Sequence, residues 1–249
     1  MDFSDTLFRC HSIGHLMTEP QSKAARERGD LSETALTHLI DIYVSRKYGR
    51  KTDVSSKYIE KGLAVEEDSI TLFCLVKGRF FKKNEETLKN RFLIGTPDLF
   101  EGESITKADH IIDVKSSWDI FTFFRNFTKD MNKMYYWQLM AYMDLSSSKS
   151  ASLAYCLVNT PESLIQDEER KLLYKMNAGT TENPYYMEAC EELRKLSIYD
   201  DIPIKERMIQ FTIERNESDI QRMHDKIEKA RLYLNELSDI ISPTKQLLT

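Results

Sequence analysis

Two short stretches decide the fold of this chain: Gly95-Thr96-Pro97-Asp98 and Ile111-Ile112-Asp113-Val114-Lys115. The glycine and proline of the first stretch mark a turn, after which Asp98-Leu99-Phe100 continues as extended chain. Residues 110–115 are short and rich in β-branched side chains, which favours a strand. Because Glu101-Gly102 lies between these extended segments, the sequence predicts a β-hairpin.

Strand geometry brings polar side chains of this hairpin together. Side chains two residues apart share a face, so we expect Asp113 and Lys115 to lie side by side while Val114 points into the opposite layer. Burying the charges of an aspartate and a lysine on the inward face of an apolar strand costs free energy, so we expect these two residues to have a function. Asp98 is expected within reach of Asp113. The two carboxylates and the main-chain carbonyl of Val114 offer hard oxygen ligands, which suit Mg²⁺ or Mn²⁺, as one or two ions.

Such a site suits phosphodiester hydrolysis. A divalent ion neutralises charge on the scissile phosphate and on the leaving oxygen. Lys115 would orient and help deprotonate the attacking water, or it would stabilise the developing charge, and the sequence leaves both roles open. An Asp-x-Lys tripeptide alone is more typical of a surface strand with an ion pair. The prediction therefore depends on the preceding turn and on the apolar strand around Asp113.

These stretches resemble motifs of the PD-(D/E)xK nuclease superfamily. Residues 95–98 and 111–117 are similar to its second and third motifs, and Gln138-Leu139-Met140-Ala141-Tyr142 resembles the Q-x-x-x-Y motif of the RecB-like and phage lambda exonuclease (YqaJ-type) branch. The resemblance implies an α/β (α+β) fold with a restriction-endonuclease-like core, in which helices flank a central mixed sheet. It implies catalytic roles for Asp98, Asp113, Lys115, Gln138 and Tyr142.

The Q-x-x-x-Y residues have a geometric reason to act together. Residues four apart share one face of a helix, so the Gln138 amide and the Tyr142 phenol are both expected to reach a phosphate. A helix in which Tyr142 merely packs is the alternative.

The resemblance also implies a glutamate on the last helix before Asp98, as a further catalytic residue and metal ligand. Gly-x-x-x-Glu settings occur at Gly62–Glu66 and Gly29–Glu33. We favour Glu66 because its surroundings fit the family better, with Glu67 as an alternative one residue away. Glu33 is expected instead in the first turn of its own helix, where a carboxylate interacts favourably with the helix dipole.

Hydroxyl side chains are implied in DNA binding. In lambda-type exonucleases, hydroxyls near the N-terminus and just before the second-motif aspartate help bind a 5′-phosphate, which by position implies Ser12 and Thr96. Arg9 is near Ser12, but not at the spacing expected of the arginine that accompanies them. Ser116 and Ser117 follow the third motif and are candidates for contacts to the DNA backbone, although strand-end capping explains them equally well.

Hydrophobic spacing predicts the remaining elements. We expect helices over about 32–48, 58–74, 132–145, 162–176, 182–196 and 218–241, and strands over 92–94, 152–158 and 207–213. The residues expected to be buried in the first two helices are Leu36, Leu39, Ile40, Tyr43, Leu63, Ile70 and Phe73. The apolar residues of the long C-terminal helix fit an amphipathic helix laid on the domain, which we favour over a coiled coil. One domain is expected over 1–249, with an N-terminal helical part (1–57), a core (about 58–160) and a C-terminal strand and helix (about 205–241).

The composition narrows the setting of the protein. Cys10, Cys74, Cys156 and Cys190 are far apart, so we expect them to be reduced and mostly buried. The sequence has no run of 18 apolar residues and no signal-peptide pattern, which predicts a cytoplasmic protein without a membrane partner. The net charge of −5 argues against nonspecific coating of nucleic acid, but it allows DNA to be held in one local channel.

Together these patterns predict a Mg²⁺-dependent deoxyribonuclease. The function we favour is a phage-type exonuclease that resects duplex DNA ends in recombination or DNA repair. The lambda resemblance implies two partners: a single-strand annealing recombinase and further copies of the chain in a ring-shaped homo-oligomer. A structure-specific endonuclease or nickase would use the same site. A catalytically inactive DNA-binding module fits less well, because all the expected acidic and basic positions are filled.

Overall fold

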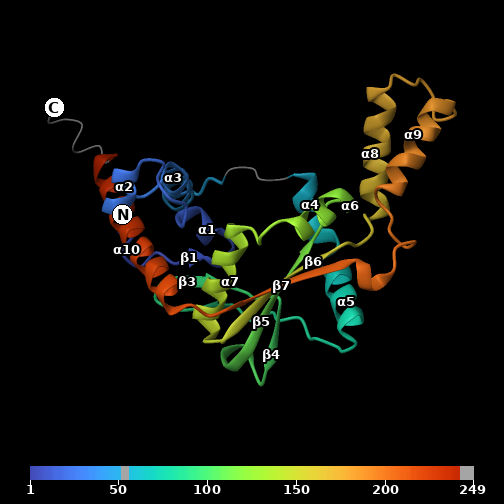
Figure 1. The fold of residues 1–249 in the computed structure, drawn as a ribbon. Coiled ribbons are helices and arrows are strands. Elements are labelled where there is room, and N and C mark those ends of the chain that lie inside the picture. The colour runs from blue at the N-terminus through green and yellow to red at the C-terminus, as the bar shows by residue number, and fades with distance from the viewer. Residues whose placement is uncertain (52–55, 242–249) are drawn as a thin grey trace.

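The predicted hairpin forms, and it belongs to a larger mixed sheet. The computed structural model describes residues 1–51 and 56–241. In it, β4 (Leu99–Gly102) pairs antiparallel with β5 (Ala108–Ser116). Strand β5 pairs parallel with β6 (Ser150–Cys156), which pairs antiparallel with β7 (Met208–Glu214). The order β4-β5-β6-β7 therefore places the strand that carries Asp113 and Lys115 in the interior of the sheet (Figure 1).

A smaller sheet brings the N-terminal segment to the same region. Strand β3 (Leu93–Gly95) pairs parallel with β1 (Phe8–Arg9) and antiparallel with β2 (Leu88–Lys89). The chain continues from β1 through the 3-10 turn η1 (Cys10–Ser12) into the short helix α1 (Ile13–Leu16). This parallel pairing places η1 next to the turn that precedes Asp98.

Strand β5 separates two hydrophobic layers. Ile112 and Val114 pack in one cluster with Ile70 and Phe73 of α5 (Glu66–Lys77). Ile111 packs in the other cluster, which contains Leu139 of α7 (Lys133–Ser146). Because side chains alternate along a strand, Asp113 and Lys115 point with Ile111 toward the α7 layer, as the sequence predicted.

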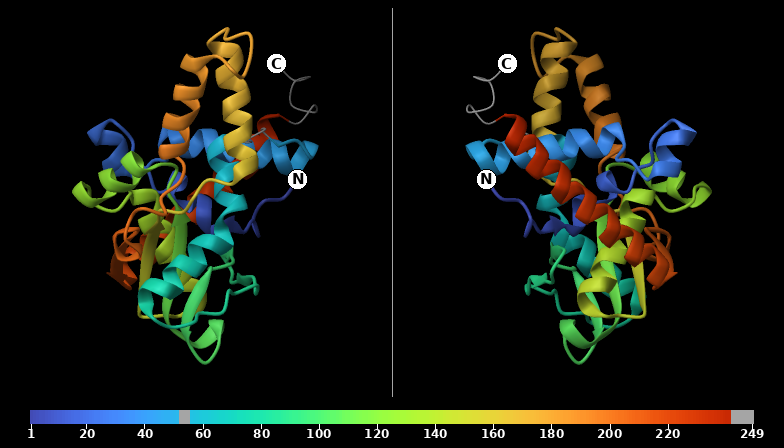
Figure 2. Two further views of the ribbon diagram at one scale, coloured as in Figure 1. Left: turned by 90° about the vertical axis from the view of Figure 1, so that its right-hand side faces the viewer. Right: turned by 90° about the vertical axis from the view of Figure 1, so that its left-hand side faces the viewer.

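The C-terminal helix α10 (Glu217–Ile240) lies along the body of the protein (Figure 2, right panel). It contacts α1, α7 and α3 (Glu33–Tyr48). Its buried apolar residues are Ile220, Met223, Ile227, Ala230 and Leu234. The preference for an amphipathic helix packed on its own domain is therefore confirmed.

Two helices project from the body at the opposite end (Figure 1). Helices α8 (Glu162–Lys175) and α9 (Pro184–Lys195) pack against each other as a helical hairpin. Arg194 joins them, with Nε 2.7 Å from Oε1 of Glu169 and Nη2 2.7 Å from Oε1 of Glu162. Two further helices are short: α2 (Lys23–Arg28) and α6 (Ile120–Arg125).

One predicted helix is in fact two. The segment expected over 58–74 forms α4 (Lys57–Ala64) and then α5, because Val65 leaves helical geometry at φ −115° and ψ 16°. The break turns α4 so that Lys61 is buried and its Nζ donates to the main-chain oxygen of Trp118 at 2.7 Å. Leu63 is consequently 71% exposed, although it was expected to be buried.

The other elements form close to their predicted ranges, with ends shifted by one or two residues. Ser32 caps α3, accepting a hydrogen bond from the N–H of Ala35 at 3.1 Å. Ile40, however, is 45% exposed, because the buried side of α3 follows Ala35, Leu39 and Tyr43.

The structure also bears on the predictions about the cysteines and about membrane-spanning segments. All four cysteines are free, with Cys10 and Cys156 buried and the other two partly buried. Across residues 1–51 and 56–241, no helix combines the length and the apolar character needed to cross a bilayer.

Candidate active site

Asp98 and Asp113 meet across the β4–β5 hairpin. Asp98 directly precedes β4, and its Oδ2 accepts a hydrogen bond from the main-chain N–H of Val114 at 2.7 Å. Asp113 is 1% exposed. Burial and then the neighbouring charge of Asp113 raise the pKa of Asp98 to about 7, because two carboxylates in a poorly solvated place resist carrying two charges.

Lys115 supplies the positive charge of the site. Its Nζ lies 2.7 Å from Oδ2 of Asp113, and the side chain is partly exposed. Burial alone would lower the pKa of Lys115, but the charges of Asp113 and Asp98 outweigh burial and raise the pKa above its usual value. Lys115 is therefore an ammonium ion that reaches from the buried carboxylates toward solvent.

Gln138 and Tyr142 share one face of α7, as predicted, and that face is turned to Asp113. Gln138 Nε2 donates to Oδ1 of Asp113 at 2.9 Å and to the Tyr142 hydroxyl at 3.1 Å. The Tyr142 hydroxyl in turn donates to the main-chain oxygen of Thr96 at 3.3 Å. Both side chains are buried, so this arrangement orients Asp113 and ties α7 to the turn before Asp98.

Gly95 makes this close approach of three segments feasible. A Cβ at Gly95 would lie 2.6 Å from Sγ of Cys10 and 2.9 Å from a ring carbon of Tyr142. The glycine of the first motif thus lets η1, β3 and α7 meet beside the carboxylates.

Glu66 is the first residue of α5 and lies near the carboxylate pair. Its negative charge is one of the smaller contributions that raise the pKa of Asp98. Lys83 pairs with both candidate glutamates, with Nζ 2.9 Å from Oε1 of Glu66 and 2.7 Å from Oε1 of Glu67. The Glu67 side chain is 73% exposed against 37% for Glu66, and the choice of Glu66 stays a prediction. Glu33 lies in the first turn of α3 as expected.

The hydroxyl residues lie in different settings. Ser12 Oγ donates to the main-chain oxygen of Arg9 at 3.3 Å, and Thr96 Oγ1 lies 2.8 Å from Thr87 Oγ1. Ser116 Oγ lies 2.7 Å from the hydroxyl of Ser69 on α5. Ser117 is buried, and within the part of the chain that the structure describes its hydroxyl has no hydrogen-bond partner.

Two groups at the site were not singled out from the sequence. Lys83 neutralises Glu66 from a separate loop, and no local pattern links the two residues. His11 of η1 also lies near Lys115: burial lowers the pKa of His11, and the positive charges of Arg9 and Lys115 lower it further. The parallel pairing of β1 with β3 brings this segment to the site, and such long-range pairing has no short sequence signal.

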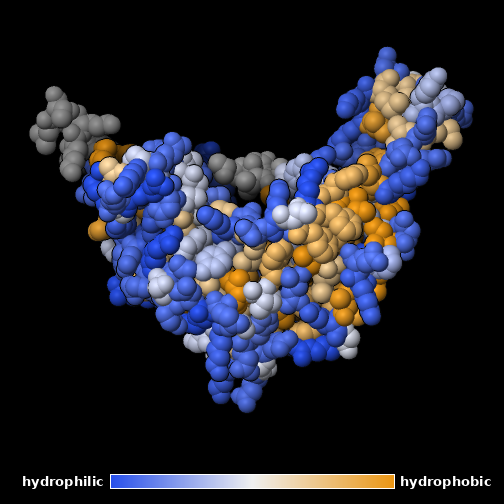
Figure 3. Space-filling view, viewed as in Figure 1, coloured by the Kyte–Doolittle hydropathy of each residue, from blue (hydrophilic) through white to orange (hydrophobic). Residues whose placement is uncertain are grey.

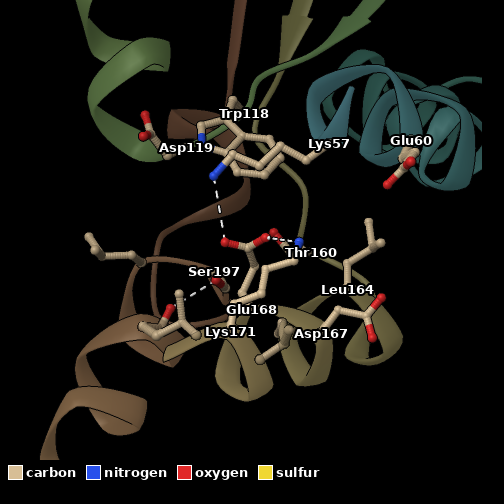
Figure 4. A pocket seen from close by; sticks show the side chains of 13 residues that line it. Lys57, Glu60, Trp118, Asp119, Thr160, Leu164, Asp167, Glu168, Lys171 and Ser197 are labelled. Atoms are coloured by element: carbon tan, nitrogen blue, oxygen red, sulfur yellow. Dashed lines mark hydrogen bonds and ion pairs between the residues drawn. The ribbon is translucent and has the colours of Figure 1, made fainter. Parts of the chain in front are cut away.

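A separate cavity of about 180 Å³ lies beyond the end of β5, at the base of α8 (Figure 4). Trp118 forms part of its wall, with Nζ of Lys57 4.9 Å from the ring centroid. Glu168 lies between Lys57 and Lys171, at 3.6 Å and 2.8 Å from their Nζ atoms. The catalytic candidates do not line this cavity, so Trp118 packs there rather than beside Asp113.

The oxygen atoms around Asp98 and Asp113 are the donors at this site that suit a metal ion. Among the residues that the structure describes, no three His, Cys, Asp or Glu side chains lie close enough to form a complete metal site. The two carboxyl groups nevertheless lie close enough for the charge of Asp113 to raise the pKa of Asp98, after the larger effect of burial. Two neighbouring carboxylates are hard oxygen donors, which fit a divalent cation such as Mg²⁺.

Comparison with known structures defines the class of fold: the chain has the fold of phage-related and alkaline exonucleases. The crystal structure of a phage-related exonuclease from Haemophilus somnus 129PT superposes with a TM-score of 0.75 and 26% identity, covering 96% of this chain and 97% of that chain. An alkaline exonuclease from Laribacter hongkongensis superposes with a TM-score of 0.63 and 10% identity, covering 99% and 96%. Its complex with dAMP gives a TM-score of 0.62. No family model and no curated protein matches the chain.

Proposed function

We propose that this protein is a metal-dependent DNA exonuclease that hydrolyses phosphodiester bonds at duplex ends. The observation that carries the proposal is the pair of Asp98 with the buried Asp113, which has Lys115 beside it on an interior strand. The likeness to a phage-related exonuclease over nearly the whole of both chains supports it. End resection in phage-type recombination is the corresponding role, with an annealing recombinase and a ring-shaped homo-oligomer as the proposed partners.

Mg²⁺ or Mn²⁺, as one or two ions, is the proposed cofactor. Asp98, Asp113 and the main-chain carbonyl of Val114 would hold it, with Glu66 as a further ligand that would have to come closer to the two aspartates. When bound, the ion supplies charge neutralisation at the scissile phosphate and activation of a water molecule. The Asp98–Asp113 pair supports this assignment, because a cation bound to both carboxylates would offset their burial and their mutual repulsion, the two effects that raise the pKa of Asp98.

The protein's own side chains have separate tasks in this proposal. Lys115 is charged and partly exposed, so it donates to the oxygen atoms on which negative charge develops. A protonated amine is a poor base, and the raised pKa therefore favours charge stabilisation over proton abstraction by Lys115. Gln138 holds one oxygen of Asp113 in place, and Tyr142 fixes the turn that carries Asp98.

A comparison of two DNA substrates tests the function. The protein is incubated with Mg²⁺ and either end-labelled linear duplex or covalently closed circular DNA of the same sequence. We expect nucleotides to be released from the linear duplex while the closed circle stays intact. Nicked circles would identify an endonuclease, and failure to cut either DNA with Mg²⁺ or Mn²⁺ would contradict a nuclease function.

A further inference from the structure

The segment after β5 carries aromatic side chains that the protein itself leaves uncovered. Phe121, Phe124 and Phe127 are 58%, 44% and 55% exposed, and they recur every third residue along α6 and the turn η3 (Asn126–Thr128). The rings of Phe124 and Phe127 stack on each other, with centroids 5.6 Å apart and an interplanar angle of 20°. Contiguous exposed apolar surface of this kind marks binding sites. Figure 3 shows apolar surface below the raised α8–α9 hairpin, where Figure 1 places α6.

Phe123 fixes these rings on the catalytic side of the sheet. It is fully buried in the hydrophobic cluster that includes Trp137 and Leu139 of α7, the helix that supplies Gln138. Its ring also meets Phe124 and Phe127 edge-on, with centroids 5.3 and 5.8 Å away. Helix α6 therefore lies in the layer toward which Asp113 and Lys115 point. The six residues from Lys115 to Phe121 span at most about 20 Å.

Basic side chains lie between and after these aromatic residues. Arg125, Lys129 and Lys133 are all exposed, and Asp130 is the one carboxylate in residues 120–133. Within the described parts of the chain, none of the three cations has an acidic partner within 4.0 Å. In a protein of net charge −5, this segment is a local cationic surface.

We propose that Phe121, Phe124 and Phe127 form a stacking surface for single-stranded DNA beside the active site, with Arg125, Lys129 and Lys133 contacting its phosphates. Exposed aromatic rings combined with cations are the features that bind single strands without sequence preference. A second protein copy covering the same rings would remove three unpaired cations from water, which is costly. A polyanion satisfies both features at once.

The inference rests on the proposed exonuclease function and names the strand that this surface binds. Removing nucleotides from one strand of a duplex end leaves the other strand unpaired next to the carboxylates. The α6 surface lies in the same layer and within reach of the site, so it binds this unpaired strand. Stacking would keep the unpaired strand from re-annealing in front of the active site.

Substitutions that separate stacking from hydrophobicity test the proposal. In the Lys115→Ala background with Mg²⁺, a fluorescein-labelled oligothymidine is titrated and its anisotropy is measured. We expect Phe121→Leu and Phe124→Leu to weaken binding by about fivefold or more each, since a stacked ring contributes at least about 1 kcal/mol. Phe→Trp at either position should preserve binding.

The phosphate contacts are tested by the salt dependence of binding. Arg125→Gln should reduce the slope of log affinity against log salt concentration by about 0.7, whereas the leucine variants should leave this slope unchanged.

Two results would contradict the proposal that these rings bind single-stranded DNA. One is unchanged affinity in the leucine variants, and the other is a change in their oligomeric state by light scattering, which would make the patch an interface between copies. The cleavage assay on the wild-type protein keeps the two proposals apart. If the wild type degrades linear duplex and the leucine variants bind oligothymidine as tightly as the parent protein, the proposed exonuclease function stands. Only the proposed stacking surface on α6 would then be contradicted.

Discussion

At the scale of single residues, Asp98 has a carboxyl group whose ionisation is disfavoured both by burial and by the charge of Asp113. Its folded-state pKa of about 7 lies above the ordinary value of 3.8 because of burial and then of Asp113. Between about pH 4 and pH 7, folded Asp98 keeps a proton that the unfolded chain releases. The free energy of unfolding of the metal-free protein therefore falls as pH rises through this window.

Asp98→Asn replaces this carboxyl group by an amide that carries no charge at any of these pH values. In the presence of a chelator, we expect the variant to be more stable than the wild type at pH 8, by at most about 4 kcal/mol, and by less than half of that margin at pH 5. The same variant should lose metal-dependent cleavage. Thermal unfolding at the two pH values measures the effect, with the exposed Asp109→Asn on the same strand as a control. A wild type that is more stable than Asp98→Asn at pH 8 would contradict a raised pKa of Asp98 in the folded protein.

Gln138 acts through Asp113, so its removal should affect both stability and activity. Gln138→Ala takes away the donor at 2.9 Å from a buried carboxylate oxygen, which we expect to lower the free energy of unfolding by about 1–3 kcal/mol. Cleavage should fall about 10- to 100-fold, as for other residues that orient a metal-binding side chain, with a smaller loss of metal affinity. Urea denaturation, a nuclease assay and calorimetry measure the three quantities. The exposed Gln166→Ala on α8 is the control, and normal cleavage in Gln138→Ala would remove Gln138 from the site.

At the scale of elements, the site depends on the meeting of η1, β3 and α7 at Gly95. Gly95→Ala places a methyl group 2.6 Å from Sγ of Cys10 and 2.9 Å from the Tyr142 ring, so a neighbour has to move. We expect a loss of about 1–3 kcal/mol in stability together with reduced cleavage, because Tyr142 holds the turn before Asp98.

Gly62→Ala is the matched control for this substitution. It lies in α4, where an added Cβ meets no atom of the described residues within 4 Å, and we expect a neutral or slightly stabilising effect. Equal stability of the two alanine variants would show that η1, β3 and α7 are less closely packed than described.

The elements also show what the sequence could predict. Strand β5 and helix α7 were predictable because each signal is local: a short β-branched strand, and two polar residues four positions apart on one helix face. The break between α4 and α5 at Val65 was not predictable, because the apolar spacing continues across it. The burial of Lys61 depends on Trp118, a partner far along the chain. The approach of His11 to Lys115 and the Lys83–Glu66 pair depend on long-range contacts in the same way.

At the scale of the whole molecule, α10 packs against α7 and against the N-terminal helices α1 and α3. Leu234 is fully buried and Leu232, on the same helix, is 63% exposed. We expect Leu234→Ala to lower the free energy of unfolding by about 2–5 kcal/mol, and Leu232→Ala to change it by no more than about 0.5 kcal/mol. Chemical denaturation at two protein concentrations checks this. If the loss in Leu234→Ala depended on concentration, α10 would pack against another copy instead of its own domain.

The central claim is that Asp98, Asp113 and Lys115 form a centre that hydrolyses DNA, and the cleavage rate of Lys115→Ala tests it most directly. The release of nucleotides from end-labelled linear duplex with Mg²⁺ is compared for the wild type, Lys115→Ala and Lys107→Ala, an exposed lysine just before the same strand. We predict that Lys115→Ala loses at least about 100-fold in rate, the effect of removing one group that stabilises transition-state charge, while it keeps its fold and binds Mg²⁺. Lys107→Ala should cleave at the wild-type rate. Cleavage by Lys115→Ala at the wild-type rate would contradict the assignment of the active site.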